Sequence, residues 1–326
     1  MTISTTNSIP VIDLAPLSGD SAGDISELAH QIYDAYSQVG FAYISNHGIS
    51  TDLVEDVFAA SQRFHALSIE DKLRIEINQH HRGYIPINTS TDRTSVIKTA
   101  ARPNQSESFM MMHELAPDDP DVMAGAPLAG LNQWPESLEG FRETITSYND
   151  ALVLLSTRLV SAFELSLQTD SLAQHFEKPT TWLRLLHYPP LQQEAPVDLF
   201  GSNPHTDYGF ITILAQDEVG GLQVRDMSGD WIDVPPVQDY FVMNSGEVLR
   251  HWSNGKLVAT PHRVINRSGR ERYSCPFFFD PNIHARIRPL PSCITGDNAS
   301  QFADIVYGEM IMEHLRSNHS QHTEAR

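Results

Sequence analysis

The sequence predicts an α+β fold with a mainly β core, in which helices support a jelly-roll barrel in the C-terminal half. Helical spacing of apolar residues dominates the first half of the 326-residue chain. From residue 182 onward, short apolar or alternating segments are separated by Gly, Pro, Asp and Asn, as in sandwiches and barrels. We expect one integrated domain: an N-terminal region of helices and strands (1–135), supporting helices (136–180), the jelly-roll core (181–290), and a C-terminal helix and tail (291–326).

The N-terminal region is predicted to combine strands with helices. Residues 9–14 and 41–44 are short and apolar, as strands are. Residues 25–38 and 51–66 place apolar side chains at intervals of three and four, which is typical of amphipathic helices. Gly40 follows the first of these helices as a terminating glycine does.

The middle of the chain is predicted to hold two loops and a long helical region. Residues 88–106 are polar and 116–133 are rich in Pro, Asp and Gly, so both are expected to be surface loops that border a site. Residues 138–172 carry an amphipathic pattern expected as one or two helices. Residues 302–317 return to helical spacing, and the polar tail 318–326 is expected to fray.

The C-terminal half is predicted to form the barrel. Its strands are expected at 182–188, 209–215, 221–225, 231–234, 240–244 and 273–279.

Composition excludes several classes of function. The formal net charge of −19 argues against nucleic-acid binding and against adsorption to anionic membranes, since both need clustered Lys and Arg. The first seven residues lack the basic start and apolar run of a signal peptide. With only two cysteines, Cys275 and Cys293, no disulfide framework is implied. We expect a cytoplasmic protein, monomeric or weakly homo-oligomeric, that acts on small molecules.

The segment His205-Thr206-Asp207 is the first candidate for chemistry. It introduces a predicted strand, where residues i and i+2 project to the same face. His262 follows 55 residues after Asp207, which leaves room for several strands to bring it back beside them. Two histidines and one carboxylate can hold an iron on one face and leave the other open. The alternative is a hydrogen-bonded His–Asp pair on the barrel rim.

Two other pairs of this chain fit the same His-x-acid pattern. His175 and Glu177 end a predicted helix, where residues i and i+2 do not face each other. His322 and Glu324 lie in the polar tail. We interpret both as solvated surface.

A second element, Arg272-Tyr273-Ser274, lies on a predicted strand that continues into the apolar run 275–279. Its guanidinium and hydroxyl share one face, and together they suit a carboxylate. A buried arginine is costly unless it meets an anion. That anion is either an internal Asp or Glu or, as we expect, an anionic ligand near the metal.

With these motifs the chain resembles the iron(II)- and 2-oxoglutarate-dependent dioxygenases of the isopenicillin N synthase-like family. The resemblance extends to the N-terminal segments 9–14 and 40–49. The remaining matching segments are 82–86, 132–135, 205–209, 216–224, 231–235, 244–248, 261–264 and 272–274, so it covers nearly the whole chain.

The resemblance implies a double-stranded β-helix (jelly roll) with supporting helices, and an oxidoreductase. His205, Asp207 and His262 would hold Fe(2+), with 2-oxoglutarate and O₂ as co-substrates. Arg272 and Ser274 would bind the distal carboxylate of 2-oxoglutarate. The products would be succinate, CO₂ and an oxidised small molecule, by hydroxylation or, as variants, desaturation or cyclisation.

Tyr188 matches a position that in relatives often contacts 2-oxoglutarate or substrate. Relatives in plants frequently carry Asn two residues earlier, where this chain has Leu186, so one co-substrate contact is in doubt. If Tyr188 faces the barrel interior, alternation puts Arg184 on the same side. Arg184 would then bind an acidic substrate or pair with a structural carboxylate.

Several further side chains are candidates for the substrate pocket. The apolar ones are Tyr84, Phe109, Met110, Met112, Phe210 and Phe279. Substrate identity does not follow from them, because specificity in such folds resides in variable loops.

Other functions remain open on the same residues. One is an oxidase like isopenicillin N synthase, in which Arg272 and Ser274 hold a substrate carboxylate and 2-oxoglutarate is not used. Another resembles the bacterial ethylene-forming enzyme. A non-catalytic binding protein and a zinc hydrolase are the remaining two, and the second leaves Arg272 and Ser274 without a role.

Overall fold

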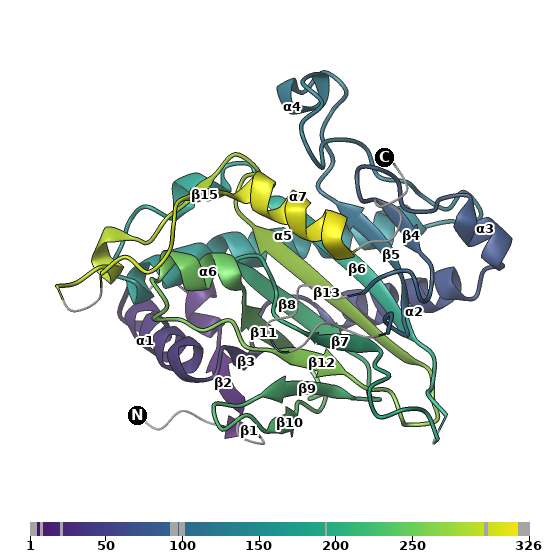
Figure 1. Cartoon of the computed structure of the whole chain (residues 1–326), viewed down its shortest axis with the longest axis horizontal. Coiled ribbons are helices and arrows are strands. Elements are labelled where there is room, and N and C mark those ends of the chain that lie inside the picture. The colour runs from purple at the N-terminus through teal and green to yellow at the C-terminus, as the bar shows by residue number, and fades with distance from the viewer. Residues whose placement is uncertain are drawn as a thin grey trace.

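The computed structural model describes residues 5–6, 9–19, 22–91, 97, 102–192, 194–296 and 299–318. Its described strands form a nine-stranded sheet, a four-stranded sheet and a two-stranded sheet (Figure 1). The nine-stranded sheet has the order β1 (Thr5–Thr6), β2 (Ile9–Asp13), β3 (Phe41–Ser45), β11 (Phe241–Ser245), β8 (Ile211–Gln216), β13 (Arg272–Asp280), β6 (Thr180–Tyr188), β5 (Glu107–Met112) and β4 (Gly83–Ile85). The four-stranded sheet has the order β10 (Trp231–Asp233), β9 (Leu222–Arg225), β12 (His262–Val264) and β7 (Ser202–His205), and β14 (Arg286–Ile287) pairs with β15 (Ile305–Val306).

Helices α1, α2 and α5 pack on one face of the nine-stranded sheet, and the four-stranded sheet lies over the other (Figure 1). The helices are α1 (Ala22–Gln38), α2 (Thr51–His65), α3 (Ile69–Leu73), α4 (Pro120–Met123), α5 (Phe141–Ser166), α6 (Glu247–Trp252) and α7 (Tyr307–Asn318). Short 3₁₀ helices are η1 (Ala15–Ser18), η2 (Ala173–Phe176) and η3 (Pro291–Cys293).

Helix α2 shows how local sequence sets this packing. Its N-cap Ser50 accepts a hydrogen bond from the Leu53 N–H group. Its buried residues include Val57, Ala60 and Phe64, whose spacing of three and four places them on one face. That face lies against α5 and the strands β6 and β13.

Two apolar cores result from these layers. The larger core fills the space between the helices and the nine-stranded sheet and includes Cys275, Phe277 and Phe279 of β13. The smaller core lies between the two sheets, inside the jelly roll, and includes Tyr188 and Val264. Successive residues of β13 therefore face different cores, and its alternate residues from Arg272 face the jelly-roll interior.

The structure confirms the predicted jelly-roll fold with supporting helices. Residues 138–172 contain one long helix, α5, and the predicted helix at 302–317 begins only at Tyr307. The sequence-based prediction lacks several strands that have only two to four residues, too few to show a period of their own: β1, β4, β7, β12, β14 and β15. It also lacks β5, whose six residues are all buried and therefore show no alternation. The pair His322 and Glu324 lies outside the described residues.

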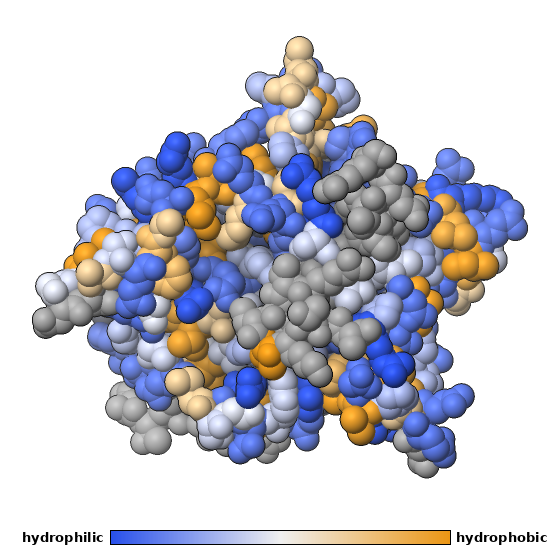
Figure 2. All heavy atoms as spheres, viewed as in Figure 1, coloured by the Kyte–Doolittle hydropathy of each residue, from blue (hydrophilic) through white to orange (hydrophobic). Residues whose placement is uncertain are grey.

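Two surface observations complete the description. Among the coloured atoms of the face in Figure 2, hydrophobic residues form small, separate groups between hydrophilic ones. Within the described part of the chain, no helix combines the length and apolar character needed to cross a membrane.

Candidate functional site

His205, Asp207 and His262 come together between the two sheets. His205 ends β7 and His262 begins β12, and the two residues are directly paired in the antiparallel register of these strands. Oδ1 of Asp207 lies 3.7 Å from Nε2 of His205 and 3.7 Å from Nε2 of His262. The three possible ligand atoms lie within 4.8 Å of one another. The predicted triplet is therefore a cluster with the donor set and spacing of a metal site.

Neighbouring groups orient each of the three side chains. Nδ1 of His205 donates to the Asn203 carbonyl at 2.7 Å, and Nδ1 of His262 donates to the Thr260 carbonyl at 3.2 Å. These bonds place the free lone pair on each Nε2, toward Asp207. Two further donors hold Asp207.

The far oxygen of Asp207, Oδ2, accepts hydrogen bonds from Thr212 Oγ1 at 2.5 Å and from Asn244 Nδ2 at 2.7 Å. Oδ1 is thereby left to face the histidines. Neither Thr212 nor Asn244 is recognisable as a site residue from the sequence, because nothing local distinguishes them from other polar residues on strands.

The electrostatics of the cluster favour the forms that bind a cation. Burial raises the pKa of Asp207, but both histidines and the bonds from Thr212 and Asn244 outweigh it, so the pKa lies below its usual range. Burial, and then the neighbouring His205, holds the pKa of His262 well below its usual range. A carboxylate beside a neutral imidazole is the state a metal ligand requires.

Arg272 lies in the jelly-roll interior and has 0% of its surface exposed. Its guanidinium donates to the Gly220 carbonyl at 2.5 Å, to Gln216 Oε1 at 3.1 Å and to Ser274 Oγ at 3.3 Å. All three acceptors are neutral, and no carboxylate of the described residues forms an ion pair with Arg272 within 4.0 Å. Asp217 lies near enough that the positive charge of Arg272 opposes the rise that burial causes in the pKa of Asp217, so an internal carboxylate interacts with Arg272 but forms no direct ion pair with it.

Tyr188 lies directly beside this arginine. It pairs with Arg272 in the register of β6 and β13, and the guanidinium carbon is 4.6 Å from the centre of its ring. Leu186 pairs with Ser274 one step further along. The predicted group of Arg272, Ser274 and Tyr188 is therefore assembled by one strand pair.

A cavity of about 150 Å³ adjoins the cluster of His205, Asp207 and His262. Alternate residues of β6 and β13 reach it: Trp182 and Arg184 from the first, Phe278 and Asp280 from the second. Helix α7 completes the wall. The other lining residues are Ser90, Thr91, Asn104, Met110, Ser202, His205, Thr206, Asp207, Tyr208, Gly209, Ile311, His314 and Leu315.

Of the residues predicted for the substrate pocket, the structure places Met110 and Arg184 in this cavity. Arg184 Nη2 donates to Ser108 Oγ at 2.9 Å. The loop 88–106 borders the cavity as predicted, through Ser90, Thr91 and Asn104. In contrast, no described residue of loop 116–133 lines it.

Five predicted pocket residues are corrected by the structure. They are at most 1% exposed in the core beneath the helices and do not line the cavity: Tyr84, Phe109, Met112, Phe210 and Phe279. The cause is strand alternation, which sends Phe109 and Phe279 away from the side that Met110 and Phe278 face.

The alternation itself was a usable signal. Counting in twos from Arg272 and Ser274 along the strand leads to Phe278 and Asp280, which line the cavity, and not to Phe279. No comparable local signal identifies Ile311, His314 and Leu315, because helix α7 reaches the site only through tertiary packing.

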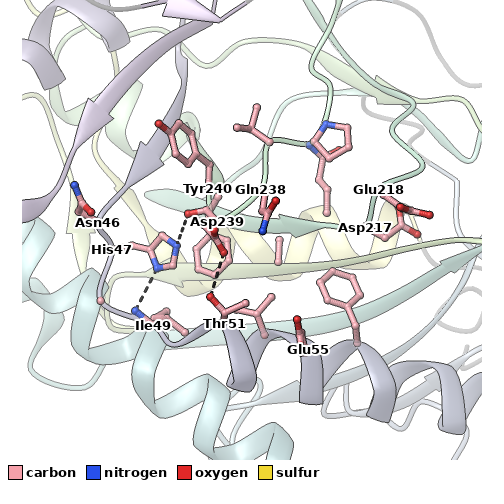
Figure 3. Close-up of a pocket in the computed structure, with 18 of the residues that line it drawn as sticks. Asn46, His47, Ile49, Thr51, Glu55, Asp217, Glu218, Gln238, Asp239 and Tyr240 are labelled. Atoms are coloured by element: carbon pink, nitrogen blue, oxygen red, sulfur yellow. Dashed lines mark hydrogen bonds between the residues drawn. The ribbon is translucent and has the colours of Figure 1, made fainter.

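A larger open groove of about 1280 Å³ lies elsewhere, between α2 and the segments 215–218 and 236–241 (Figure 3). His47 lies within it, bonded to the Asp239 carbonyl and to the Ile49 N–H group, and Thr51 bonds the Asp239 carboxylate. None of the predicted metal or co-substrate residues lines this groove. The smaller cavity is therefore the one that adjoins the cluster of His205, Asp207 and His262.

Comparison with known proteins places this geometry in a family. Residues 9–137 match the family described as non-haem dioxygenase in morphine synthesis N-terminal, and residues 179–281 match the 2OG-Fe(II) oxygenase superfamily. A 2-oxoglutarate-Fe(II) type oxidoreductase, hxnY of Emericella nidulans, is 33% identical over 314 residues, covering 93% of this chain and 88% of that protein. A homoarginine-6-hydroxylase of Oryza sativa subsp. japonica is 32% identical, covering 95% and 97%.

A solved structure shows the same architecture. A full-length Neurospora crassa protein in complex with alpha-KG and thymine superposes with a TM-score of 0.83 at 27% identity, covering 97% of this chain and 99% of that one. With its paired His-Asp-His cluster, the chain therefore belongs to the 2OG-Fe(II) oxygenase superfamily and is an oxidoreductase that uses iron(II) and 2-oxoglutarate on a small molecule.

Proposed function

We propose that His205, Asp207 and His262 bind iron(II) and that Arg272, Ser274 and Tyr188 bind the distal carboxylate of 2-oxoglutarate. The reaction we assign is hydroxylation of an unactivated C–H bond, with release of succinate and CO₂. Bound iron supplies the redox chemistry with O₂, and the side chains supply binding and orientation.

The environment of Arg272 is the observation that carries this proposal. Among the described residues, the direct hydrogen-bond acceptors of this buried guanidinium are all neutral and Asp217 acts on it only at longer range, so part of the cost of a buried ion, on the order of several kcal/mol, remains. A bound dicarboxylate removes that cost through paired hydrogen bonds to Arg272 and Ser274. Tyr188 covers the guanidinium on its aromatic face.

The strand pair β6–β13 places the proposed co-substrate residues and the substrate cavity at different points along its length. Arg272, Ser274 and Tyr188 lie at one end, and Trp182 and Phe278 lie opposite each other at the cavity end. Ser274 and Phe278 are four residues apart, or roughly 13 Å along the strand. In this proposal 2-oxoglutarate lies along that length, between its carboxylate anchor and the substrate cavity.

The test is anaerobic titration of the protein with iron(II) and 2-oxoglutarate, observing the visible charge-transfer band of the chelate. We expect the band in the wild type and its loss in His205→Ala and Asp207→Ala. His284→Ala, a variant of a histidine that pairs with Asp121 on the surface, is the matched control and should retain the band. A wild-type protein without the band and without O₂ uptake would contradict the proposal.

The co-substrate assignment has its own test. Arg272→Lys keeps the charge but loses the two-pronged geometry, so the KM for 2-oxoglutarate should rise by about 10- to 100-fold. O₂ consumption without succinate would instead favour the oxidase that does not use 2-oxoglutarate.

For the substrate, we propose a molecule with one ring and an anionic or carbonyl group directed at Arg184. A cavity of about 150 Å³ accommodates a single ring such as benzene. Trp182, Tyr208 and Phe278 offer aromatic surfaces to it, and Arg184 is the only Lys or Arg among the described lining residues. The Neurospora crassa structure, in complex with the one-ring compound thymine, is consistent with this size.

Succinate release with a panel of one-ring compounds tests this assignment. Compounds with a carboxylate or ring carbonyl should be turned over, and Arg184→Gln should raise their KM by about 10- to 100-fold, the range for a lost charge-assisted hydrogen bond. Arg184→Lys should have a smaller effect. Equal KM values for Arg184→Gln and wild type would exclude Arg184 as the anchor.

We also propose a cytoplasmic location and a monomeric or weakly oligomeric state. Two buried free cysteines, Cys275 and Cys293, support a reducing compartment. The net charge of −19 disfavours adsorption of the protein to anionic membranes. Cell fractionation and size-exclusion chromatography over a range of concentrations test the two statements.

A further inference from the structure

Asp280, the last residue of β13, is a point where three parts of the site meet. Its side chain is buried, 3% exposed, and borders the substrate cavity. Oδ1 accepts the Phe210 N–H group at 2.8 Å. Oδ2 accepts Trp182 Nε1 at 3.0 Å and the Tyr307 hydroxyl at 2.7 Å.

The first of these contacts leads to Asp207, the proposed metal ligand. The turn 207–210 runs from that residue to Phe210, and the Gly209 backbone lies so close to Asp280 that a Cβ atom at Gly209 would be 1.6 Å from Oδ1. On its other side the turn is held by the start of α6, where Glu247 N donates to the Asp207 carbonyl at 2.8 Å. Asp280 and α6 thus hold the turn between them.

The second contact leads to the C-terminal helix. Tyr307 is the first residue of α7 and is 0% exposed. From there α7 extends along the cavity, which it lines with Ile311, His314 and Leu315. The His314 ring lies 3.5 Å, centre to centre, from Tyr208 of the turn 207–210.

We propose that Asp280 is a positioning residue that holds the turn 207–210, the cavity wall at Trp182 and the roof formed by α7 in one fixed arrangement. This inference rests on the proposed metal site. It adds a residue that touches neither the metal nor 2-oxoglutarate but determines how the substrate cavity lies relative to both. Asp280 does so because its two oxygens accept from three buried donors on separate elements.

The chemistry of the three donors explains why a carboxylate stands here. The Phe210 N–H, the Trp182 N–H and the Tyr307 O–H groups all need acceptors, and only a carboxylate offers acceptors on both oxygens without a donor. Burial raises the pKa of Asp280 to about 7, whereas these three bonds favour its charged form. An asparagine would direct an NH₂ group at one of the donors and leave it without a partner.

Two variants separate the contact of Asp280 with the turn 207–210 from its contact with α7. Tyr307→Phe removes only the bond to α7, so amide hydrogen exchange in residues 307–318 should rise about 10-fold while the Kd for iron(II) in the presence of 2-oxoglutarate stays within about 2-fold of wild type. Asp280→Ala removes both acceptor oxygens, so exchange in residues 307–318 should rise at least as much and the Kd for iron(II) should also rise about 10-fold. In the double variant of Asp280→Ala and Tyr307→Phe, exchange should match that of Asp280→Ala alone, because both changes remove the same contact.

Tyr148→Phe is the matched control. Its hydroxyl is buried in α5 and has no hydrogen-bond partner among the described residues, so both measurements should equal those of wild type. Unchanged exchange in Tyr307→Phe overturns the inference, even if Asp280→Ala does not fold. An equal loss of iron affinity in Tyr307→Phe and Asp280→Ala also overturns it, because the contact with α7 and the contact with the turn 207–210 would then not be separate. If wild type fails to form the iron–2-oxoglutarate chelate, the proposed function fails instead.

Discussion

At the scale of single residues, Asp207 shows how much a proposed metal ligand depends on its neighbours. One of its oxygens faces the two histidines, and the other is held by Thr212 and Asn244. Without those bonds the carboxylate could rotate and present either oxygen to a metal. The outer contacts therefore fix the orientation of the inner group.

Thr212→Val tests this dependence with little change of shape. Loss of the hydroxyl frees one side of Asp207, so the Kd for iron(II) should rise about 10-fold, at the low end of the range for outer contacts of metal sites. The measurement is iron titration monitored by the 2-oxoglutarate chelate band. Thr157→Val is the control, because that hydroxyl only donates to the Val153 carbonyl on the exposed side of α5; equal Kd values for the two variants would contradict the prediction.

At the scale of elements, strand β13 distributes its side chains between two environments. Phe278 is half-buried and lines the substrate cavity, whereas Phe279 is 0% exposed and stacks on Phe176 with ring centres 5.0 Å apart. Two adjacent phenylalanines thus lie in different environments, one at the cavity and one in the core.

The variants Phe279→Ala and Phe278→Ala compare the two environments directly. Phe279→Ala should lower the free energy of unfolding by about 3–5 kcal/mol, as core Phe→Ala changes do, with the effect seen in urea unfolding. Phe278→Ala should cost much less stability and should instead change the KM of the one-ring compound that is turned over. The reverse pattern would show that the register of β13 differs from the one described.

A buried polar network joins β5 and β6 to α3. Glu107 accepts hydrogen bonds from Lys72 and from His187 Nδ1, both at 2.8 Å, and from the Tyr84 hydroxyl. His187 Nε2 bonds Glu271 in turn. Tyr84 is therefore a member of this network, which explains why it does not belong to the substrate pocket.

This network makes stability depend on pH. Burial alone would lower the pKa of His187, but its bonds with Glu107 and Glu271 outweigh burial and raise the pKa above the ordinary 6.5. The contribution of protonated His187 is thus fully present below pH 6.5 and is lost as the pH rises through the raised pKa. Burial lowers the pKa of neighbouring His65 to about 3, so this group adds stability as the pH rises from about 3 to 6.5, below the range in which the His187 contribution is lost.

His187→Gln isolates the contribution of one group. Below pH 6.5 the variant should be less stable by roughly 2 kcal/mol, a value below that for fully buried pairs because Glu271 is half exposed. The difference in Tm should shrink as the pH rises into the alkaline range. His284→Gln, at an exposed pair, should change Tm little at any pH; a difference for His187→Gln that stays constant with pH would contradict the assignment.

At the scale of the whole molecule, one sheet connects segments far apart in the chain. β3 of the N-terminal region pairs with β11 of the jelly roll, and β4 and β5 extend the same sheet from its other side. The N-terminal segments are therefore part of the barrel wall.

We accordingly expect the chain to unfold as a single domain. Urea unfolding followed by tryptophan fluorescence and by far-UV circular dichroism should give coincident transitions, because neither half retains its sheet without the other. Two separated transitions would instead indicate an independently stable N-terminal region.

The sequence by itself determined the candidate metal ligands, the candidate co-substrate arginine and serine, and the jelly-roll class of fold. Arg272 and Ser274 depend on local strand geometry, because residues two apart in β13 share a face. The same reasoning placed His205 and Asp207 at the start of one strand, but His205 ends β7 and Asp207 lies in the turn 207–210, so the turn and the bonds from Thr212 and Asn244 orient Asp207. The paired register of His205 and His262 places the third candidate ligand beside the other two.

Only the tertiary structure decided which residues enclose the substrate cavity. A period of two separates the faces of a strand but does not say which face a given aromatic residue needs, so Phe279 was predicted where Phe278 lies. Helix α7 and the contacts of Asp280 bring together residues between 27 and 98 positions apart. Such contacts depend on the packing of the whole chain. That packing places α7 along the cavity and brings the Asp280 carboxylate to the point where β6, the turn 207–210 and α7 meet.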